Sequence, residues 1–594
     1  MFVYPDDDNT TWPRGDGVEV VIGSKVGART VTDILWTVHL ANKKANCFVL
    51  TETGRQGIVS YGDGHLPPMR NPSLEHAGAP QPPVARRIGL MNDPKRVFQL
   101  TIDPGPRVIS GADAPAVRFD KRTLAQHVDT QGVIVPLPQY PKSFPDDSFA
   151  QMDAPSGAID TLGELLTDAR GRLLVLGGYG KAAGWHIDGQ APTLDDDVNN
   201  NQWFDDTGDG PVSAHLVFDD GSRAAVQGAW VTATDPAFAP QILNVVSLWD
   251  DIYDTWVRTQ KLAPAMYDED KGGFQSGYRP TFDDQIQPIF ASAAMQQWVV
   301  NLSQRAISAH AALSAISAAD DPATTPLAGI KAIFRSPYDP AQQDNIALMP
   351  AHLGDAGESF LTLRKTQYFF LERWNAGKTN YLAGAGPALG PGELLDKATF
   401  VNCLGGRFSP GIDLTFVMRE AAIYQLPWSV AGPFRLRAKP LAYASTRPAG
   451  VPLLTAGYVP RHAEADGLEP GDLGKFMALP WHTDYNSCAT HLPSPNPAGN
   501  RTLFWSWPAQ RPVAVYTDGD VFWGSDDAPD ASPSEDTSTW NEFWQLGQQR
   551  WSVRGQGTQS PYAEKWGRYQ LRRDMLMNWS RIGIVMQATQ VPAP

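Results

Sequence analysis

Residues 213–233 read SAHLVFDDGSRAAVQGAWVTA, and this stretch decides how the first part of the chain folds. β-Branched and aromatic residues lie on both sides of Asp219, Asp220 and Gly221, which are turn-forming residues. Two such runs joined by a short polar turn predict a β-hairpin. We expect a Pro-Gly turn between two strands in 97–111, and strands in three further segments. The four segments are VEVVIG (18–23), ILWTVHL (34–40), VFQLTIDPGPRVISG (97–111) and RLLVLGGYG (172–180).

The pattern changes after Pro240. Apolar residues recur at three- and four-residue spacing in ILNVVSLWDDIYDTWV (242–257) and in IQPIFASAAMQQWVVNLSQRAISAHAALSAI (286–316), which is typical of amphipathic helices. The sequence therefore predicts an α+β fold with β-rich N-terminal and C-terminal units around a helical middle segment. Its 50 prolines and 53 glycines predict many loops. The predicted units are 1–235, 236–330 and 331–594.

Composition excludes several classes of protein. A net charge of −15 argues against nucleic acid as a partner, because phosphate binding needs a concentrated basic surface. The three cysteines, Cys47, Cys403 and Cys488, are too few and too scattered for a disulfide framework. No apolar run approaches the roughly 18 residues that suggest a membrane span. The N-terminus is acidic and polar, unlike a secretory signal, so we expect a cytoplasmic protein or leaderless export.

Two weaker motifs have competing interpretations. LGGYG (176–180) is too short to predict dinucleotide binding. A series of aspartates offers oxygen atoms to a hard cation, which would suit a metal-dependent oxidase. The ordinary alternative, which we favour on spacing, is a set of Asx turns in a solvated loop, with no metal bound. The aspartates are Asp195, Asp196, Asp197, Asp205, Asp206 and Asp209.

Seven separated stretches, in order along the chain, point to one family. They are WTVHLANKKA (36–45), IDPGPRVISG (102–111), LGELLTDARGRLLVLGGYG (162–180), NNNQWFDDTGDGPV (199–212), CLGGRFSPGID (403–413), PWHTDYNSC (480–488) and WPAQRP (507–512). On these motifs the chain resembles the LodA-like family of lysine ε-oxidases and glycine oxidases. The resemblance implies a cysteine tryptophylquinone, a cofactor made by oxygenating a tryptophan of the chain and bonding it to a cysteine sulfur. It places this cofactor in the C-terminal unit.

The motif PWHTDYNSC supplies the cysteine, Cys488, and a carboxylate, Asp484, that would take protons during cofactor formation and turnover. They are four residues apart, so one helical turn would put them on the same face. Their ordinary alternatives are a buried apolar cysteine and a helix cap. Of the tryptophans downstream, we predict Trp579 as the partner, because WSRIGIV resembles the family's late motif. Trp551 is the reserve.

The resemblance also assigns a substrate pocket. Phe204 falls where relatives carry a tyrosine or phenylalanine near the quinone, and Cys403 matches a pocket position that is cysteine or histidine in relatives. A cysteine buried beside a Gly-Gly turn is an equal alternative for Cys403. His482 flanks the cysteine motif and is the third candidate. Its ordinary alternative is a hydrogen-bonded core histidine.

The implied reaction is the oxidative deamination of an amino acid. A primary amine forms a Schiff base on the quinone, and Asp484 removes the α-proton. Hydrolysis gives an oxo product, and O₂ reoxidises the cofactor with release of ammonia and hydrogen peroxide. The resemblance also implies a separate flavoprotein that assists cofactor formation, and a homo-oligomer. The alternative is a non-catalytic or unmodified relative that keeps the scaffold as a binding or structural protein.

Overall fold

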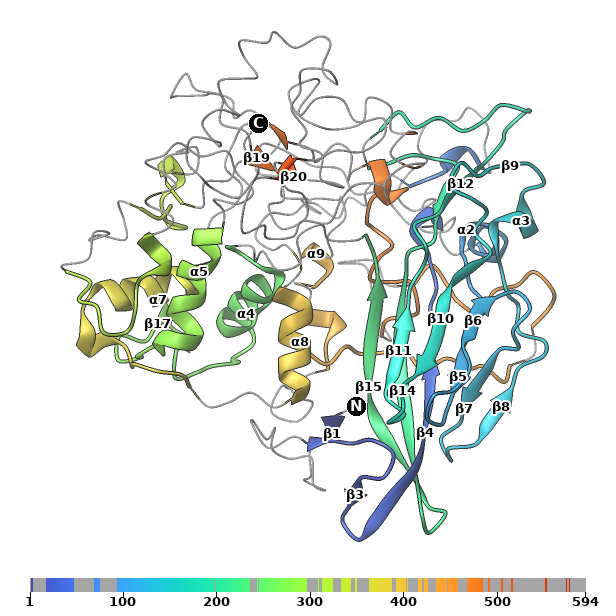
Figure 1. Cartoon of the computed structure of the whole chain (residues 1–594). Helices are drawn as coiled ribbons and strands as arrows, with labels where there is room; N and C mark the ends of the chain where they lie inside the picture. The colour runs from blue at the N-terminus through green and yellow to red at the C-terminus, as the bar shows by residue number, and fades with distance from the viewer. Residues whose placement is uncertain are drawn as a thin grey trace.

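The structure is a computed structural model. It describes residues 2–3, 18–46, 69–74, 93–196, 198–235, 243, 245–295, 308, 312–323, 333–342, 348–349, 363–386, 391–401, 403, 415–418, 421–425, 434–445, 447–457, 467–483, 490–491, 504–505, 514–515, 551–552, 573 and 576. Figure 1 shows two groups of elements within this part of the chain, with antiparallel sheets on one side and helices on the other.

The largest sheet has the strand order β15-β14-β4-β3. β3 pairs with the N-terminal end of β4, and β5 pairs with its C-terminal end. The predicted hairpin is confirmed, because β14 and β15 pair in antiparallel register around the turn at Gly221. β14 is mostly buried whereas β15 is mostly exposed or half-buried, so β14 is a central strand and β15 an edge strand. The strands are β3 (Lys25–Val26), β4 (Arg29–Val38), β5 (Arg107–Ile109), β14 (Gly208–Phe218) and β15 (Arg223–Ala233).

Smaller sheets extend this side of the molecule. One has the order β11-β10-β6 and another β13-β12-β9, while β7 pairs with β8. Their bounds are β6 (Val117–Asp120), β7 (Gln126–Val128), β8 (Ile134–Pro136), β9 (Met152–Asp153), β10 (Thr161–Thr167), β11 (Leu173–Leu176), β12 (Ala182–Trp185) and β13 (Trp203–Asp205). Short pairs elsewhere are β1 (Phe2–Val3) with β2 (Val18–Glu19), β16 (Tyr267–Asp268) with β17 (Gly273–Phe274), β18 (Thr490–His491) with β19 (Phe504–Trp505), and β20 (Ala514–Val515) with β21 (Trp551–Ser552).

One predicted strand is wrong. Residues 97–100 lie in helix α2 (Pro94–Leu100), and only the second strand of 97–111 forms, as β5. Asp93 caps the helix by accepting the backbone N–H of Lys95, and Pro94 occupies the first helical position. A capping aspartate followed by proline is a helix-start signal, because proline needs no hydrogen bond there and has a helical φ. This signal outweighs the β-branched and aromatic content of VFQL.

The helical group is built from α4 (Leu248–Thr259), the π-helix η4 (Phe282–Ile286), α5 (Gln287–Met295), α7 (Lys365–Asn375) and α8 (Pro391–Val401). The predicted helix in 242–257 is confirmed as α4, and the first part of 286–316 is confirmed as α5. Short turns of helix are η1 (Lys44–Asn46), η3 (Pro72–Leu74), α3 (Pro145–Ser148), η7 (Pro340–Gln342), η8 (Lys378–Asn380), α9 (Thr415–Met418) and η9 (Ala421–Ile423).

Two hydrophobic cores hold these groups. The first lies among the sheets and includes Trp36, Trp185 and Phe204, and it also takes in Leu479 and Leu576 from late in the sequence. The second lies among the helices, with α7 residues from beyond position 330 packed on α5. The α+β fold is confirmed, whereas the boundaries at 235 and 330 stay predictions. No helix in the described part of the chain has the length and apolar character needed to cross a membrane.

Candidate active site

The first residues of PWHTDYNSC are held in the sheet-side core. After a cis peptide bond between Leu479 and Pro480, residues 481–483 form a buried helical turn. The backbone N–H of Trp481 donates to the Asp205 carboxylate at 3.1 Å, and Asn200 Nδ2 donates to the Leu479 carbonyl at 3.1 Å. The NNNQWFDDTGDGPV stretch therefore fixes the chain immediately before Asp484 and Cys488.

Lys44 and Asp205 form the centre of this anchor. Their side chains are 2% and 0% exposed, and Lys44 Nζ lies 2.7 Å from Asp205 Oδ2. Lys44 Nζ also donates to the Ala478 carbonyl at 3.0 Å, while Asn42 and Thr207 donate to the other carboxylate oxygen of Asp205. Burial works to raise the pKa of Asp205, but the charge and hydrogen bond of Lys44 outweigh it and hold that pKa below its usual value. The buried carboxylate thus stays ionised and has a donor on both oxygens.

Lys43, next to Lys44 in the sequence, belongs to a second group of buried charges. Its Nζ lies 2.7 Å from Glu469 and 3.1 Å from Asp472, and Lys475 Nζ lies 3.0 Å from Asp472. Consecutive lysines of WTVHLANKKA therefore bind two different parts of the segment 469–483. These four side chains are essentially inaccessible to solvent. Their ion pairs connect the segment 469–483 to the stretch that follows β4.

His482 is a neutral, buried side chain. Its ring stacks on Trp481 with centroids 3.8 Å apart, and Nε2 lies 2.9 Å from the Gly180 carbonyl. Burial lowers the pKa of His482 to about 3. Since a carbonyl only accepts, Nε2 carries the proton of the neutral ring and Nδ1 keeps a lone pair. His482 thus joins the LGGYG stretch to the cysteine motif and adds no positive charge there.

The aspartate series separates into different environments. Asp196 forms the expected Asx turn on an exposed loop, accepting the N–H groups of residues 198 and 199. The solvated-loop interpretation is wrong for the later three, because Asp205, Asp206 and Asp209 are buried. Asp206 accepts the backbone N–H groups of residues 179 and 181, and Asp209 accepts those of residues 473 and 474 and the indole N–H of Trp230.

The three buried aspartates act as hydrogen-bond acceptors inside the protein. Burial raises the pKa of Asp206 and of Asp209 to about 6 in each case. The carboxylates accept from separate protein donors instead of converging on one point. Among the described residues, no group of three His, Cys, Asp or Glu side chains is arranged to hold a metal ion.

The predicted pocket residues have different surroundings. Phe204 is fully buried on β13, with its ring centroid 5.4 Å from Trp185 and 6.1 Å from Phe149. Cys403 follows α8 and lines a cavity of about 100 Å³ with Trp230 and Phe434, and its Sγ lies 3.5 Å from the Thr399 carbonyl. Phe204 does not line that cavity. The pocket roles of Phe204, Cys403 and His482 stay predictions.

Most of the residues predicted to form the cofactor lie outside the described part of the chain. Asp484, Cys488 and Trp579 lie outside the described residues. The backbone of Trp551 lies in β21, opposite Val515 of β20. The roles of these four residues therefore stay predictions. No sequence motif predicted a role for Lys44. Two lysines inside an otherwise apolar, strand-rich stretch are the signal that could have revealed its buried ion pair.

Two family models match most of the folded parts described above. The one for the L-lysine epsilon oxidase N-terminal part matches residues 14–233, and the one for the L-lysine epsilon oxidase C-terminal domain matches residues 343–507. The chain belongs to the L-lysine epsilon oxidase family. The anchor described here joins the two matched regions, since Lys44 and Asp205 lie in the first and residues 478–483 in the second.

Individual relatives agree with this family. The chain is 30% identical over 496 residues to the L-lysine 6-oxidase of Marinomonas mediterranea, an alignment that covers 77% of this chain and 60% of that protein. The chain thus spans about 60% of the relative's length, less than two thirds. The solved structure of the epsilon-lysine oxidase from M. mediterranea matches with a TM-score of 0.57 at 26% identity, over 82% of this chain and 66% of the other. The structure of the L-Lys Schiff base intermediate of that enzyme matches in fold, with a TM-score of 0.64 at 24% identity over 95% and 82% of the two chains.

Proposed function

We propose that this chain is an amino-acid oxidase that deaminates a primary amine of an amino acid with O₂, using a cysteine tryptophylquinone formed from Cys488 and a downstream tryptophan. The observation that carries the proposal is the buried anchor of Lys44 and Asp205, which joins both family-matched regions at the entrance to PWHTDYNSC. The relative named L-lysine 6-oxidase supports the reaction class.

The described residues fit a cofactor that the chain makes from itself. Such a group needs no cradle for an outside molecule, but it needs its cysteine held in a defined place in a dry environment. Trp481, His482 and Thr483 are buried, and hydrogen bonds to Asp205 and Gly180 fix the turn they form. Cys488 follows this turn by five residues in the sequence.

Once formed, the quinone would supply an electrophilic carbonyl and would accept an electron pair from the substrate. O₂ would then take this electron pair, with two protons, and be reduced to hydrogen peroxide. In this proposal Asp484 takes the proton from the carbon that bears the reacting amine. A neutral His482 is compatible with Asp484 acting as this base, because a positive imidazolium two residues away would lower the basicity of the Asp484 carboxylate. The fixed charge of Lys44 is already paired with Asp205.

Phe204, Cys403 and His482 form the proposed pocket, and the substrate is proposed as an amino acid without a named side chain. L-Lysine and glycine are the first substrates to try, since the matched relative is an L-lysine 6-oxidase and glycine oxidation is implied by the motif resemblance. A flavoprotein that completes the cofactor and a homo-oligomeric state belong to the same proposal.

Mass spectrometry tests the cofactor directly. Protein expressed with a flavoprotein partner is digested with trypsin, and we expect a Cys488 peptide linked to a tryptophan peptide with the quinone oxygens gained and the corresponding hydrogens lost. Cys488→Ser and Asp484→Asn should abolish the linked species, whereas Cys47→Ser is the matched control that should keep it. Trp579→Phe and Trp551→Phe tell the two tryptophans apart.

Activity is measured on the same samples as hydrogen peroxide released from L-lysine or glycine. Loss of peroxide together with the linked peptide in Asp484→Asn is the expected result. Unlinked peptides in every sample, with no peroxide, would contradict the oxidase proposal and favour a non-catalytic relative.

A further inference from the structure

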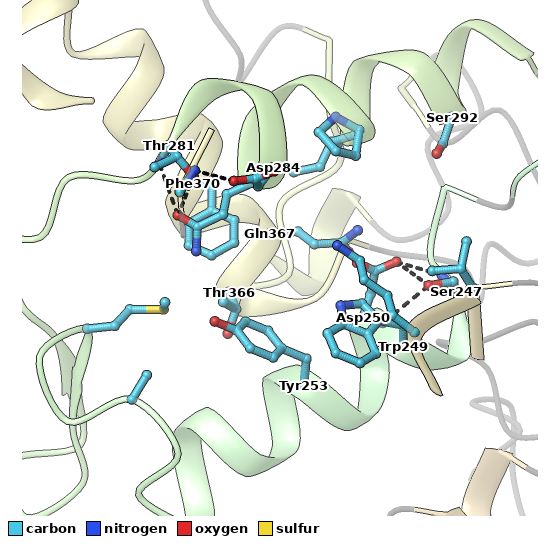
Figure 2. A pocket seen from close by; sticks show the side chains of 18 of the residues that line it. Ser247, Trp249, Asp250, Tyr253, Thr281, Asp284, Ser292, Thr366, Gln367 and Phe370 are labelled. Atoms are coloured by element: carbon cyan, nitrogen blue, oxygen red, sulfur yellow. Dashed lines mark hydrogen bonds between the residues drawn. The ribbon is translucent and has the colours of Figure 1, made fainter. Parts of the chain in front are cut away.

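A cavity of about 810 Å³ lies within the helical group, between α4, η4, α5, α7 and α8 (Figure 2). None of the predicted site residues Phe204, Cys403 and His482 lines it. Its volume falls in the range of about 300–1,000 Å³ that small-molecule sites in proteins occupy. The cavity therefore has the size of a ligand site, and its described lining does not include these three predicted pocket residues.

A carboxylate lines one wall of this cavity with one oxygen open. Asp250 lies in the first turn of α4, where its Oδ2 accepts the N–H and the hydroxyl of Ser247 at 2.8 and 2.7 Å. Its Oδ1 has no hydrogen-bond partner among the described residues. Burial and the neighbouring Asp251 raise the pKa of Asp250 to about 6, while the hydrogen bonds of Ser247 and the charge of Lys397 oppose the rise, so the group is mostly ionised above neutral pH. A half-buried carboxylate with an open oxygen favours a cationic partner.

An ammonium group lines the same cavity. Lys397 of α8 places Nζ 5.5 Å from the ring centroid of Trp249, and it forms no ion pair with a carboxylate in the described part of the chain. Lys397 is near enough to lower the pKa of Asp250 but does not close a salt bridge with it. Opposite charges thus face one cavity without neutralising each other by contact.

The rest of the lining is mainly aromatic and aliphatic. The ring of Tyr253 stacks beside Trp249 with centroids 5.9 Å apart, and Phe370 and Phe434 contribute further apolar surface. Figure 2 shows Asp250 and Trp249 at one side of the cavity, with Phe370 and Asp284 away from them. The Asp284 carboxylate at that side accepts the backbone N–H of Gly386. A ligand with both charges at one end and an apolar group at the other fits the remaining lining.

We propose that this cavity binds a zwitterionic α-amino acid with an apolar side chain, with its ammonium on Asp250, its carboxylate on Lys397 and its side chain against Tyr253 and Phe370. A plain amine would leave the Lys397 ammonium without a counter-charge, and a plain carboxylate would leave Asp250 without one. Because an unpaired charge is costly in a partly dry cavity, the zwitterion is the ligand that satisfies both groups.

The cavity adjoins the neighbourhood of Cys403. Phe434 lines both this cavity and the small one that contains Cys403, and the N–H of Leu248, at the start of α4, donates to the Cys403 carbonyl at 2.8 Å. An amino acid bound to Asp250 would thus sit on the same helix end that supports Cys403. The proposal goes beyond the oxidase function and does not depend on it.

Calorimetric titration of the full chain, expressed without a flavoprotein partner, tests the binding in the absence of turnover. L-Phenylalanine is the probe, and 3-phenylpropionate and 2-phenylethylamine are its analogues lacking the amine or the carboxylate. We expect L-phenylalanine to bind and each analogue to bind at least about tenfold more weakly, because each loses one charge pair. Equal affinity for the three ligands, or no binding of L-phenylalanine, would overturn the proposal.

Variants locate the binding. Lys397→Met keeps the aliphatic stem on α8 and should weaken L-phenylalanine at least about tenfold. The matched control is Lys365→Met, since Lys365 also lies over a ring, 5.3 Å from that of Tyr338, but does not line the cavity. Asp250→Asn, which keeps a capping oxygen for Ser247, should weaken binding as well.

Asp484→Ala separates this site from the proposed reaction centre. We expect it to bind L-phenylalanine as the unaltered chain does, even if no peroxide is ever detected. Binding that persists in Lys397→Met but disappears in Asp484→Ala would place the amino acid at the reaction centre and refute a second site.

Discussion

Replacing Lys44 by methionine removes the ammonium from the buried pair with Asp205 while keeping most of the side chain's length. The carboxylate of Asp205 would remain in a place with no solvent access, with hydrogen bonds from Asn42, Thr207 and the Trp481 N–H but no counter-charge. The Ala478 carbonyl would also lose its donor. The variant should therefore destabilise both the sheet-side core and the residues around Ala478 and Trp481, which precede Asp484 and Cys488 in the sequence.

The size of the effect follows from the burial. Removing one partner of a buried ion pair costs about 3–5 kcal/mol, because the other charge is left uncompensated. For a unit of 150–250 residues each kcal/mol lowers the melting temperature by about 2–4 °C, so we expect a fall of roughly 6–20 °C. An exposed pair gives a contrasting control. Lys261 and Asp270 lie 3.4 Å apart with side chains 60% and 86% exposed, and Lys261→Met should cost no more than about 1 kcal/mol.

Thermal unfolding followed by intrinsic tryptophan fluorescence measures both variants under the same conditions. Lys44→Met combined with Asp205→Asn should recover much of the loss, because neither charge is then left alone. If Lys44→Met melted within a degree of Lys261→Met, the buried pair of Lys44 and Asp205 would not stabilise the fold. If the double variant melted far below Lys44→Met, the uncompensated carboxylate would not be the cause.

Two further predictions concern the buried residues His482 and Gly210. The pKa of His482 is about 3 in the folded chain and near 6.5 when unfolded. Below about pH 6.5 the unfolded state therefore binds a proton that the folded state does not, and stability falls by about 1.4 kcal/mol per pH unit as the pH drops toward 3. His482→Phe should flatten this dependence in melting curves at pH 7.5 and 5.0, and an unchanged slope would count against the assignment. Gly210→Ala should cost about 1–3 kcal/mol or prevent folding, because its methyl would collide with the His39 carbonyl oxygen, whereas Gly273→Ala meets nothing within 4 Å and should melt as the unaltered chain does.

Predictions of local structure from the sequence were correct where one signal was dominant. The hairpin around Gly221 and helix α4 formed as predicted, because the turn residues of the first and the apolar spacing of the second act over a few neighbours. Residues 97–100 show the limit, since their side chains favour a strand while Asp93 and Pro94 start a helix. Local preferences conflict there, and the helix cap decides between them.

Family membership was within reach of the sequence alone, because seven motifs in order do not depend on knowing how they pack. What the motifs do for one another was decided only by the tertiary structure. Adjacent Lys43 and Lys44 differ in no local property, yet one pairs with Glu469 and Asp472 and the other with Asp205. Asp205, Asp206 and Asp209 looked like one solvated group and became three separate buried carboxylates. The physical reason is that a buried charge is stable only beside an opposite charge or hydrogen-bond donors. These partners can lie hundreds of residues away in the sequence, and only folding brings them within hydrogen-bond distance.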